Sequence, residues 1–344
     1  MSKHTFIEAC YRRPTSHVPV WLMRQAGRYQ PSYREVRKGV SFFDLCQNAD
    51  LAAQVTINAV EEMNVDAGII FSDILVPLRA MGAPVELTEA GPKLTPPIRT
   101  ASDVDKLQLV DPAETMPFVM DAIRKFNAHF SNQVPLIGFA GGPITLAAYL
   151  VEGGHSRNFI ELKKMLFCEP RLAHNLLEKL GKMVARHLIA QVEAGCHAVQ
   201  VFDSWVGILS PDDFREFALP YTRAIFEELR ACGVPRIYFG TDTSTLLEQI
   251  TTIDAEVLGL DWRIDLDVGW KRIGDRFAVQ GNLDPLCLLM DEPALEQRIQ
   301  RILDRAAKRP GFIFNLGHGI LPPTDPARVR FLVDTVHRLS KTAG

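Results

Sequence analysis

Short apolar runs alternate with longer amphipathic stretches along this chain, and the alternation predicts its secondary structure. Apolar runs bounded by Gly, Pro or Asp predict eight buried parallel strands at Val18–Met23, Ala67–Asp73, Val134–Ala140, Ala198–Ser204, Pro235–Gly240, Val257–Trp262, Phe277–Gly281 and Phe312–Leu316. The amphipathic stretches between them predict helices, among them Asp50–Met63, Arg157–Leu166, Arg171–Ala194, Pro211–Arg230 and Ala294–Lys308. This order predicts an α/β fold in which helices cover a parallel sheet.

Eight strands separated by helices fit a (β/α)8 barrel, the TIM-barrel architecture, better than an open sheet. An open doubly wound sheet is the alternative, because a strand count from one sequence can miss by about one or two. The whole chain, 1–344, is predicted to form a single domain. Within it, Met81–Thr115 holds several prolines and little periodicity, and we interpret it as an excursion after the second strand.

The barrel prediction locates the chemistry, because such folds carry their active sites at the C-terminal ends of the strands. Polar residues follow nearly every predicted strand: Arg24 to Arg28, Asp73, Asp203 and Ser204, Thr241 and Asp242, Asp261, Asn282 and Asp284, and His318. The sequence therefore predicts one rim lined with arginine, aspartate and histidine.

The stretch WLMRQAGRYQPSYR, Trp21–Arg34, contains three arginines and no acidic residue. A charged loop or helix start is the ordinary explanation for such a cluster. However, Arg24 and Arg28 directly follow the first predicted strand, where Gly27 allows the backbone to turn sharply. Guanidinium groups bind carboxylates with two parallel hydrogen bonds. This favours an anion site at Arg24 and Arg28, whereas Arg34 is expected to hold the segment in place.

Three further residues are candidates for ligand contacts, each beside an ordinary structural explanation. Asp73 ends an apolar strand, where it can accept ligand N–H groups or cap the next turn. Tyr149 ends GFAGGPITLAAY and can project its hydroxyl into a site or pack as a helix residue. His318 lies between two glycines at the last strand end, which favours ligand contact over a structural role.

Several common motifs are missing from these segments. GFAGGP has neither the GxGxxG spacing of a dinucleotide fold nor the Gly-Lys-Ser/Thr of a phosphate loop. FDSWVG, which contains Phe202 and Ser204, is not a GxSxG elbow, so a nucleophilic serine is not expected. The nine histidines form no HxH, HExxH or HxC pattern, and the six cysteines form no CxxC pair. The sequence therefore predicts no metal ligands.

Charge and hydropathy limit the possible partners. A net charge of −3 and a pI of about 6.3 give no general basic field for nucleic acid, so any anion site must be local. The N-terminus lacks the apolar run of a signal peptide, and no apolar stretch has the length of a membrane span. We expect a cytoplasmic protein with reduced thiols and with no nucleic-acid or membrane partner.

Long stretches of the chain resemble a known family. PVWLMRQAGRYQPSYR is similar to the N-terminal signature of uroporphyrinogen decarboxylases, and GFAGGPITLAAYLVEGG to that family's second signature. FSDIL, VFDSWVG, VQGNLDP and FNLGHGI follow in the same order and spacing, so the resemblance covers nearly the whole chain. Ser32 stands where the family usually has an acidic residue, and Ile144 where an aromatic one is usual.

The resemblance implies a (β/α)8 barrel, a homodimer, and a polyanionic tetrapyrrole substrate, uroporphyrinogen III. The reaction removes carbon dioxide from four acetate side chains to give coproporphyrinogen III, with no cofactor or metal. By the same resemblance, Arg24 and Arg28 would bind carboxylates, and Asp73 would accept hydrogen bonds from the pyrrole N–H groups. From the chemistry of the reaction we expect Asp73 to stabilise a cationic intermediate and hypothesise that Arg24 or Arg28 donates the proton. The implied substrate contacts are Arg24, Gln25, Ala26, Gly27, Arg28, Asp73, Tyr149, Phe202, Ser204 and His318, with Arg24, Arg28, Asp73 and Tyr149 catalytic.

Two other functions stay open from the sequence. A zinc-dependent methyltransferase of corrinoid metabolism shares this fold in related families, but it needs an HxC pair, and here Cys196 and His197 are adjacent. A non-catalytic tetrapyrrole-binding protein would have the same pocket and would release no carbon dioxide.

Overall fold

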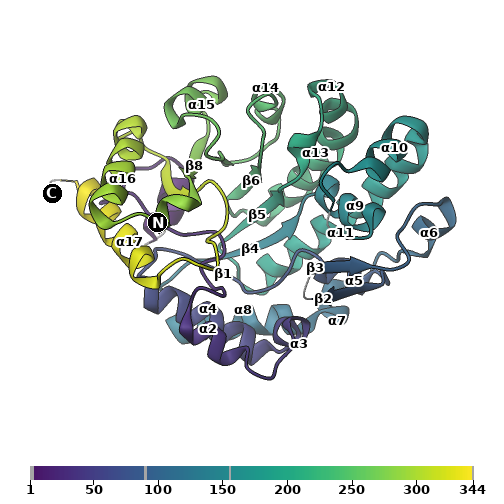
Figure 1. Ribbon diagram of the computed structural model, residues 1–344, viewed down its shortest axis with the longest axis horizontal. Helices are drawn as coiled ribbons and strands as arrows, with labels where there is room; N and C mark the ends of the chain where they lie inside the picture. The colour runs from purple at the N-terminus through teal and green to yellow at the C-terminus, as the bar shows by residue number, and fades with distance from the viewer. Residues whose placement is uncertain (1–3, 89–90, 155, 343–344) are drawn as a thin grey trace.

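Seven parallel strands form one curved sheet within the part of the chain that the structure, a computed structural model, describes: residues 4–88, 91–154 and 156–342. The sheet has the strand order β1-β4-β5-β6-β7-β8-β9, so its order runs one way with no reversal (Figure 1). Its strands are β1 (Gly68–Ile69), β4 (Leu136–Gly141), β5 (Ala198–Asp203), β6 (Arg236–Gly240), β7 (Val257–Gly259), β8 (Ala278–Leu283) and β9 (Phe312–Leu316). A doubly wound sheet would reverse its order at a switch point. The predicted TIM-barrel type of fold is therefore confirmed.

The eighth position of the barrel is filled by irregular chain, so the prediction of a regular strand over Val18–Met23 is wrong. Only Val20 pairs, in an isolated parallel bridge with Phe314 of β9. On its other side the Val20 oxygen accepts the Asp66 N–H at 2.8 Å, while the Val20 N–H donates to the Asp66 carboxylate at 2.7 Å. Pro19 has no N–H to offer a ladder. A side chain therefore takes over part of the pairing that a neighbouring strand would supply.

Helices surround the outside of the sheet in an arc (Figure 1). They are α1 (Thr5–Cys10), α2 (Pro31–Val36), α3 (Phe42–Gln47), α4 (Ala49–Met63), α5 (Val76–Ala80), α6 (Ala101–Lys106), α7 (Pro112–Thr115), α8 (Pro117–Phe130), α9 (Pro143–Glu152), α10 (Ile160–Cys168), α11 (Pro170–Glu193), α12 (Pro211–Asp213), α13 (Leu219–Glu228), α14 (Leu247–Ile250), α15 (Leu266–Ile273), α16 (Glu292–Ala306) and α17 (Pro326–Ser340). Short 3-10 helices span Val206–Ile208, Leu229–Cys232 and Pro285–Leu289. No helix in the described ranges is both long and apolar enough to cross a membrane.

The long helix predicted over Pro211–Arg230 is divided. A π-helical turn over Phe214–Ala218 separates α12 from α13. Pro220 lies in the first turn of α13 and has no N–H, so the α-helical hydrogen-bond ladder cannot run unbroken through it. The other four predicted helices coincide with α4, α10, α11 and α16 apart from small shifts at their ends.

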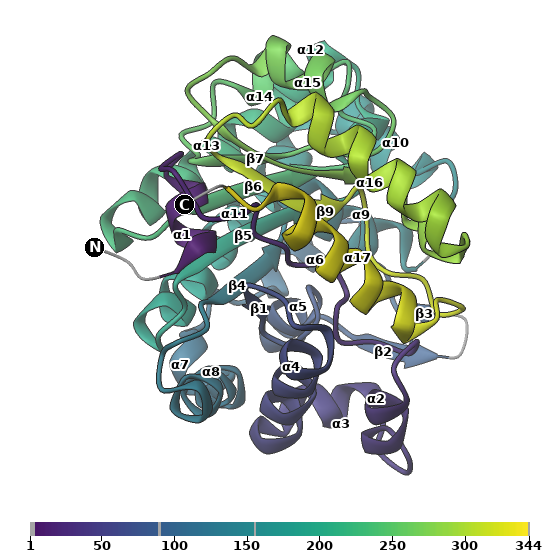
Figure 2. The ribbon, with the colours of Figure 1, turned by 90° about the vertical axis from the view of Figure 1, so that its left-hand side faces the viewer.

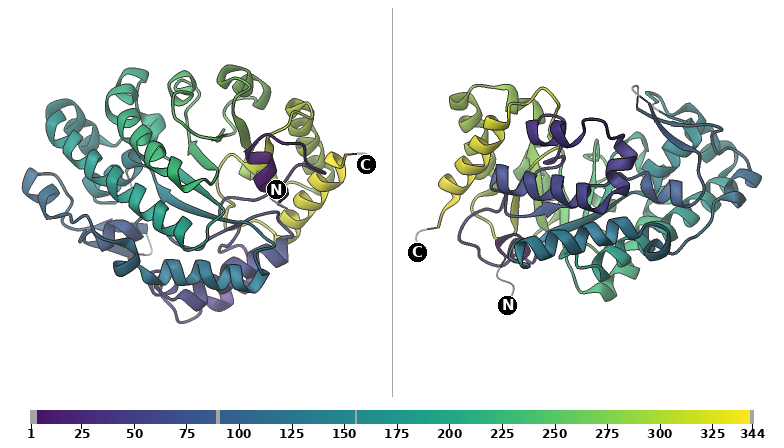
Figure 3. Two further views of the ribbon diagram at one scale, coloured as in Figure 1. Left: turned by 180° about the vertical axis from the view of Figure 1, so that it is seen from behind. Right: turned by 90° about the horizontal axis from the view of Figure 1, so that it is seen from below.

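One apolar layer lies between the sheet and the helices, and a second fills the inside of the barrel. The inner layer has side chains from every position around the barrel, including Trp21, Ile69, Ile137, Phe239 and Ile313. Helix α1 adds Phe6, Ile7, Ala9 and Cys10 to the same cluster, so it closes the N-terminal end of the barrel. Figure 2 shows α1 at one end of the molecule and the β2–β3 hairpin toward the other, and Figure 3 shows the same barrel from behind and from below. The opposite, C-terminal end is left for a site.

The predicted excursion over Met81–Thr115 contains an antiparallel hairpin, β2 (Val85–Thr88) and β3 (Gly91–Leu94), followed by α6 and α7. Its backbone is bonded to the end of α9: Leu94 N–H donates to the Gly153 oxygen at 2.9 Å, and Ile98 N–H to the Leu150 oxygen at 2.9 Å. The hairpin therefore belongs to the surroundings of α9, while the assignment of 1–344 to one domain stays a prediction.

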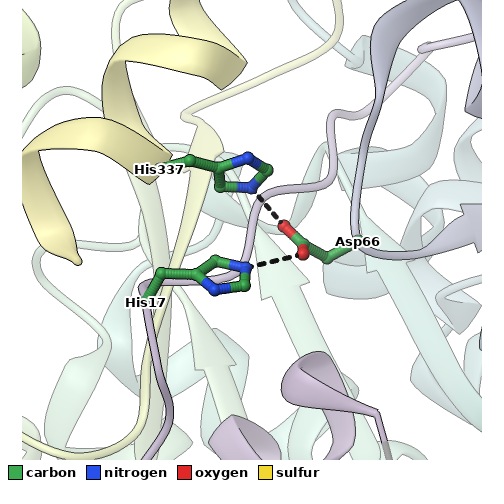
Figure 4. A group of neighbouring side chains, drawn as sticks. All are labelled: His17, Asp66 and His337. Atoms are coloured by element: carbon green, nitrogen blue, oxygen red, sulfur yellow. Dashed lines mark hydrogen bonds and ion pairs between the residues drawn. The ribbon is translucent and has the colours of Figure 1, made fainter. Parts of the chain in front are cut away.

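A carboxylate between two histidines closes the seam where the barrel begins and ends (Figure 4). Asp66 accepts from His17 Nε2 at 2.9 Å and from His337 Nε2, on α17, at 2.7 Å. The two imidazole rings meet edge to face at 4.6 Å. Burial raises the pKa of Asp66, but the two histidine bonds and the Val20 N–H outweigh it and lower the pKa from an ordinary 3.8 to about 2. Ionised Asp66 therefore ties the N-terminal segment, the start of β1 and α17 together.

Replacing this carboxylate should reveal its contribution as a pH-dependent loss of stability. A folded-state pKa of about 2 corresponds to about 2 kcal/mol of stabilisation of the ionised form. Because the pKa is lowered on folding, this stability is present above about pH 4 and is lost as the pH falls toward about 2. Urea unfolding of Asp66→Asn should therefore differ from wild type by about 2 kcal/mol at neutral pH and converge near pH 2.

The matched control is Asp121→Asn, since the Asp121 carboxylate is about half exposed and pairs with Arg124 one helical turn away. Its effect should stay below about 0.5 kcal/mol. A loss at Asp66→Asn that is the same at every pH would contradict the account.

Candidate active site

A cavity of about 380 Å³ lies at the C-terminal end of the barrel. Every residue predicted to contact a ligand lines it: Arg24, Gln25, Ala26, Gly27, Arg28, Asp73, Tyr149, Phe202, Ser204 and His318. The sequence did not identify its apolar wall, which includes Tyr33, Phe42, Phe71, Pro92 and Ile320. Apolar residues carry no local signal that separates a pocket wall from an ordinary core, and a mostly apolar wall with a few polar groups is typical of ligand sites.

Arg24 and Arg28 are exposed, and neither guanidinium bonds to any described residue. The chain turns sharply here: Arg24 has a left-handed backbone with φ of 61°, and the Gln25 N–H donates to the Leu22 oxygen at 2.9 Å. Gly319 makes room for the side chain, because an added Cβ there would lie 2.4 Å from Arg24 Cδ. Two unpaired cations therefore stand at the cavity.

Gln25 holds this turn instead of presenting a free amide. Its Oε1 accepts the Leu22 N–H at 3.1 Å, and its Nε2 donates to the Ala67 oxygen at 3.2 Å. Arg34 acts in the same way, since it donates to the oxygens of Arg28 and Tyr29 at 2.9 and 2.8 Å. The segment is therefore fixed by side chains whose partners lie in the protein backbone.

Asp73 lies opposite these cations after β1. One oxygen, Oδ1, accepts the Leu75 N–H at 2.8 Å, which is the turn-capping contact that the sequence left as an alternative. The other, Oδ2, has no hydrogen-bond partner in the described part of the chain. Burial raises the pKa of Asp73, while the Leu75 N–H and the Arg24 charge oppose the rise. The cap fixes the carboxylate and leaves its second oxygen for a ligand.

Tyr149 comes from α9, and its ring centroid lies 4.2 Å from that of Trp205. Burial, and then the charge of Asp73, raises the pKa of Tyr149 to about 12, so the hydroxyl keeps its proton. Phe202 meets Phe139 edge to face at 5.6 Å. Ser204 offers its side chain beside them, while its backbone oxygen accepts the Thr241 hydroxyl.

His318 is held neutral in a defined orientation. Its Nδ1 accepts the Gly319 N–H at 2.6 Å, so the ring proton of the neutral form is on Nε2. Burial lowers the pKa of His318 to about 4, with smaller effects from the charges of Arg24 and Arg263. Gly317 lets this loop pass close by, since an added Cβ would lie 2.4 Å from the Trp262 nitrogen. His318 is therefore a hydrogen-bond donor without charge.

The remaining residues of the predicted rim hold loops and do not line the cavity, so of that rim only Arg24 to Arg28, Asp73, Ser204 and His318 reach it. The buried Asp261 carboxylate accepts the Asp242 N–H at 2.6 Å and Arg263 Nη1 at 2.8 Å. Asn282 donates to the Asp261 backbone oxygen at 2.9 Å. Asp284 caps a 3-10 helix through the Leu286 N–H. Sequence position alone does not show that these partners are within reach.

The chain matches one protein family from end to end. Residues 1–339 match the family described as "Uroporphyrinogen decarboxylase (URO-D)". The chain belongs to the uroporphyrinogen decarboxylase family. It is 51% identical over 332 residues to the uroporphyrinogen decarboxylase of Myxococcus xanthus, covering 96% of this chain and 95% of that one. It is 47% identical over 339 residues to the enzyme of Syntrophotalea carbinolica, covering 98% of each chain, and 44% identical over 337 residues to that of Carboxydothermus hydrogenoformans, covering 98% and 96%.

A solved structure described as a methyltransferase has the same fold. A methyltransferase from Methanosarcina mazei superposes with a TM-score of 0.82 at 19% identity, over 98% of this chain and 99% of that one. At this identity the likeness shows the fold alone. In the described chain no cysteine lines the cavity, so a zinc–thiolate centre has no ligands there. The described group of three residues that could hold a metal, His17, Asp66 and His337, lies at the opposite end of the barrel.

The neutral state of His318 gives a test of the site's electrostatics. We expect its ring to titrate near pH 4 in an NMR titration, against an ordinary 6.5, and to carry its proton on Nε2 at pH 7. The missing resonance in His318→Asn assigns the signal. A titration midpoint near 6.5, or a proton on Nδ1, would contradict the arrangement.

Proposed function

We propose that this protein catalyses the cofactor-free removal of carbon dioxide from the four acetate side chains of uroporphyrinogen III, giving coproporphyrinogen III. The observation that carries the proposal is one cavity with two unpaired guanidinium groups and a carboxylate that has a free oxygen. Membership in the uroporphyrinogen decarboxylase family supports it. The homodimer implied by the resemblance and the cytoplasmic location expected from the sequence remain parts of the proposal.

Binding of a polyanion follows from the charge distribution. The protein as a whole carries a net charge of −3, so the attraction has to come from Arg24 and Arg28 at the cavity. Each guanidinium can bind a carboxylate with two hydrogen bonds. The Tyr149 hydroxyl and His318 Nε2–H add donors that bring no competing charge. The apolar wall is suited to the carbon framework of the macrocycle.

The chemistry needs an electron sink, because loss of carbon dioxide leaves an electron pair on the exocyclic carbon. In the proposed step a proton adds to the neighbouring pyrrole carbon, which makes the ring cationic. The bond between the exocyclic carbon and its carboxylate then breaks, and its electrons flow into the ring to give a neutral exocyclic methylene. The exocyclic carbon takes up a proton to become methyl, and the ring carbon loses the proton that it gained, which restores the pyrrole. Ionised Asp73 would accept the pyrrole N–H groups and stabilise the cation, since a fixed charge in a site shielded from water acts strongly.

The proton donor is proposed to be Arg24 or Arg28, the two cations that line the cavity. A guanidinium is a weak acid, so the donation depends on a close and well-oriented approach of the guanidinium to the pyrrole carbon. Tyr149 is proposed to act beside Asp73, because the charge of Asp73 adds to the effect of burial in raising the pKa of the Tyr149 hydroxyl.

Replacing Asp73 with Asn should separate turnover from binding. The amide keeps the shape of the carboxylate and loses its charge, so kcat should fall by about 10²–10³ while KM changes by less than about threefold. An anaerobic assay with reduced uroporphyrinogen III and chromatography of the products measures both constants. Asp275→Asn, at an exposed position, is the control and should match wild type. Retained turnover in Asp73→Asn would contradict the role.

Lysine at Arg24 or Arg28 should weaken binding. Each substitution keeps the charge and loses the two-pronged contact, so KM should rise about tenfold. Arg124→Lys, on the outer face of α8, is the control. An unchanged KM for both Arg24→Lys and Arg28→Lys would argue against carboxylate binding at these positions.

The same assay and a metal analysis decide between the alternatives. Carbon dioxide release by wild type excludes a protein that only binds tetrapyrroles. Stoichiometric zinc in the purified protein, together with catalytic methyl transfer, would instead favour a methyltransferase.

A further inference from the structure

Asp203 is a buried carboxylate directly under the cavity that the proposed reaction does not use. It ends β5 between Phe202 and Ser204, which both line the cavity, yet its own side chain is completely buried. No cation pairs with it in the described part of the chain. Burying an unpaired carboxylate is unfavourable, so its contacts have to explain its presence.

The carboxylate caps the helix that carries Tyr149. Its Oδ1 accepts the Thr145 N–H at 3.0 Å and the Thr145 hydroxyl at 2.7 Å. Thr145 is the third residue of α9, and the residue at the cap position, Gly142, has no side chain to bind the free N–H groups. Asp203 therefore supplies from the neighbouring strand the cap that α9 lacks in its own sequence.

Gly142 is the residue that permits this contact. An added Cβ at Gly142 would lie 2.4 Å from Asp203 Cγ, so any larger residue would displace the carboxylate. The Gly142 N–H also donates to the Phe202 oxygen at 2.7 Å. The close approach of α9 to β5 is therefore built around Asp203.

The hydrogen bonds of Thr145 connect two segments that line the cavity, one with Ser204 and one with Tyr149. The Thr145 hydroxyl donates to Asp203 and accepts the Trp205 N–H at 3.1 Å. The Trp205 ring packs on Tyr149 at 4.2 Å. One carboxylate thus connects the strand end that bears Ser204 with the helix that bears Tyr149.

The second carboxylate oxygen of Asp203, Oδ2, and the neighbouring Tyr238 hydroxyl each lack a partner at full hydrogen-bond geometry among the described residues. Against the larger effect of burial, the nearby hydroxyl still lowers the pKa of Asp203. Burial raises the pKa of Asp203 to about 6. A neutral side chain would be easier to bury, and a half-satisfied carboxylate at a ligand cavity is typical of functional residues.

We propose that Asp203 is a positioning residue for decarboxylation, which caps α9 from β5 and thereby fixes the Tyr149 hydroxyl relative to Ser204 and Asp73. The inference rests on the proposed function. It adds a role for a residue that does not touch the cavity.

The test compares three variants with wild type in the anaerobic assay: Asp203→Asn, Thr145→Val and Thr145→Ser. Asp203→Asn weakens the cap and Thr145→Val removes its hydroxyl, so both should lower kcat about 10- to 100-fold, as expected for a shift of about 1 Å in a reacting group. KM should change less than about threefold, because Arg24 and Arg28 lie outside this network. Thr145→Ser keeps the hydroxyl and should restore kcat to within about twofold of wild type.

A matched control separates positioning from stability. Thr222, on α13, is also fully buried and donates its hydroxyl at 3.0 Å to the oxygen of Ala218, the last residue of the preceding π-helical turn. Thr222→Val should lower the melting temperature and leave kcat unchanged. If Asp203→Asn does not fold, the Thr145→Val and Thr145→Ser pair carries the test, since both keep the carboxylate.

The outcomes distinguish the two proposals. A wild type that releases no carbon dioxide would overturn the proposed function and this inference with it. An active wild type with kcat of Asp203→Asn and Thr145→Val within twofold of its own would overturn this inference alone, as would a loss in Thr145→Ser equal to that in Thr145→Val. A lower kcat at unchanged KM, rescued by serine and not seen in Thr222→Val, is the result expected.

Discussion

The barrel depends on how its last gap is closed. Seven strands pair in regular order, but the eighth position has a single bridge at Val20, and the Asp66 carboxylate binds the N–H that would otherwise have no partner. Because buried backbone groups need partners, this contact lets irregular chain complete the sheet. Arg24 and Arg28 follow a few residues later along the same segment, which Gln25 and Arg34 then hold at the cavity. The segment that closes the barrel is therefore also the one that carries the two cations.

The cavity separates its charges from its neutral donors. Arg24 and Arg28 keep their charge at the exposed mouth, while burial holds Tyr149 and His318 neutral. Asp73 is the carboxylate in the same cavity, fixed through one oxygen by the Leu75 N–H. In the proposed function such a set binds anions at the edge and keeps one negative charge for a positive centre beneath them. Asp73 is the exception to the rule that burial disfavours charge: burial raises its pKa, and the Leu75 N–H and the Arg24 charge oppose that rise.

The sequence was sufficient for seven of the eight predicted strands and for the polar residues of the cavity, because both have local signals. Apolar runs end in polar residues, and the arginine and GHG segments are short and distinctive. It was insufficient where a partner lies far along the chain. Gln25 binds the Ala67 oxygen, and Asp261 binds the Asp242 N–H, so both are framework groups in a motif that looks like a binding site. Apolar wall residues such as Phe42 had no signal because only the fold distinguishes them from core.

Helix α1 closes one end of the barrel, and this restricts traffic through the site. The cavity at the C-terminal end is then the way in for a ligand. In the proposed reaction one Asp73 serves four acetate side chains, so the macrocycle would have to be reoriented between steps, either within the cavity or by leaving and returning. With the N-terminal end closed, any exchange of partly decarboxylated molecules during the proposed reaction would pass through the cavity mouth.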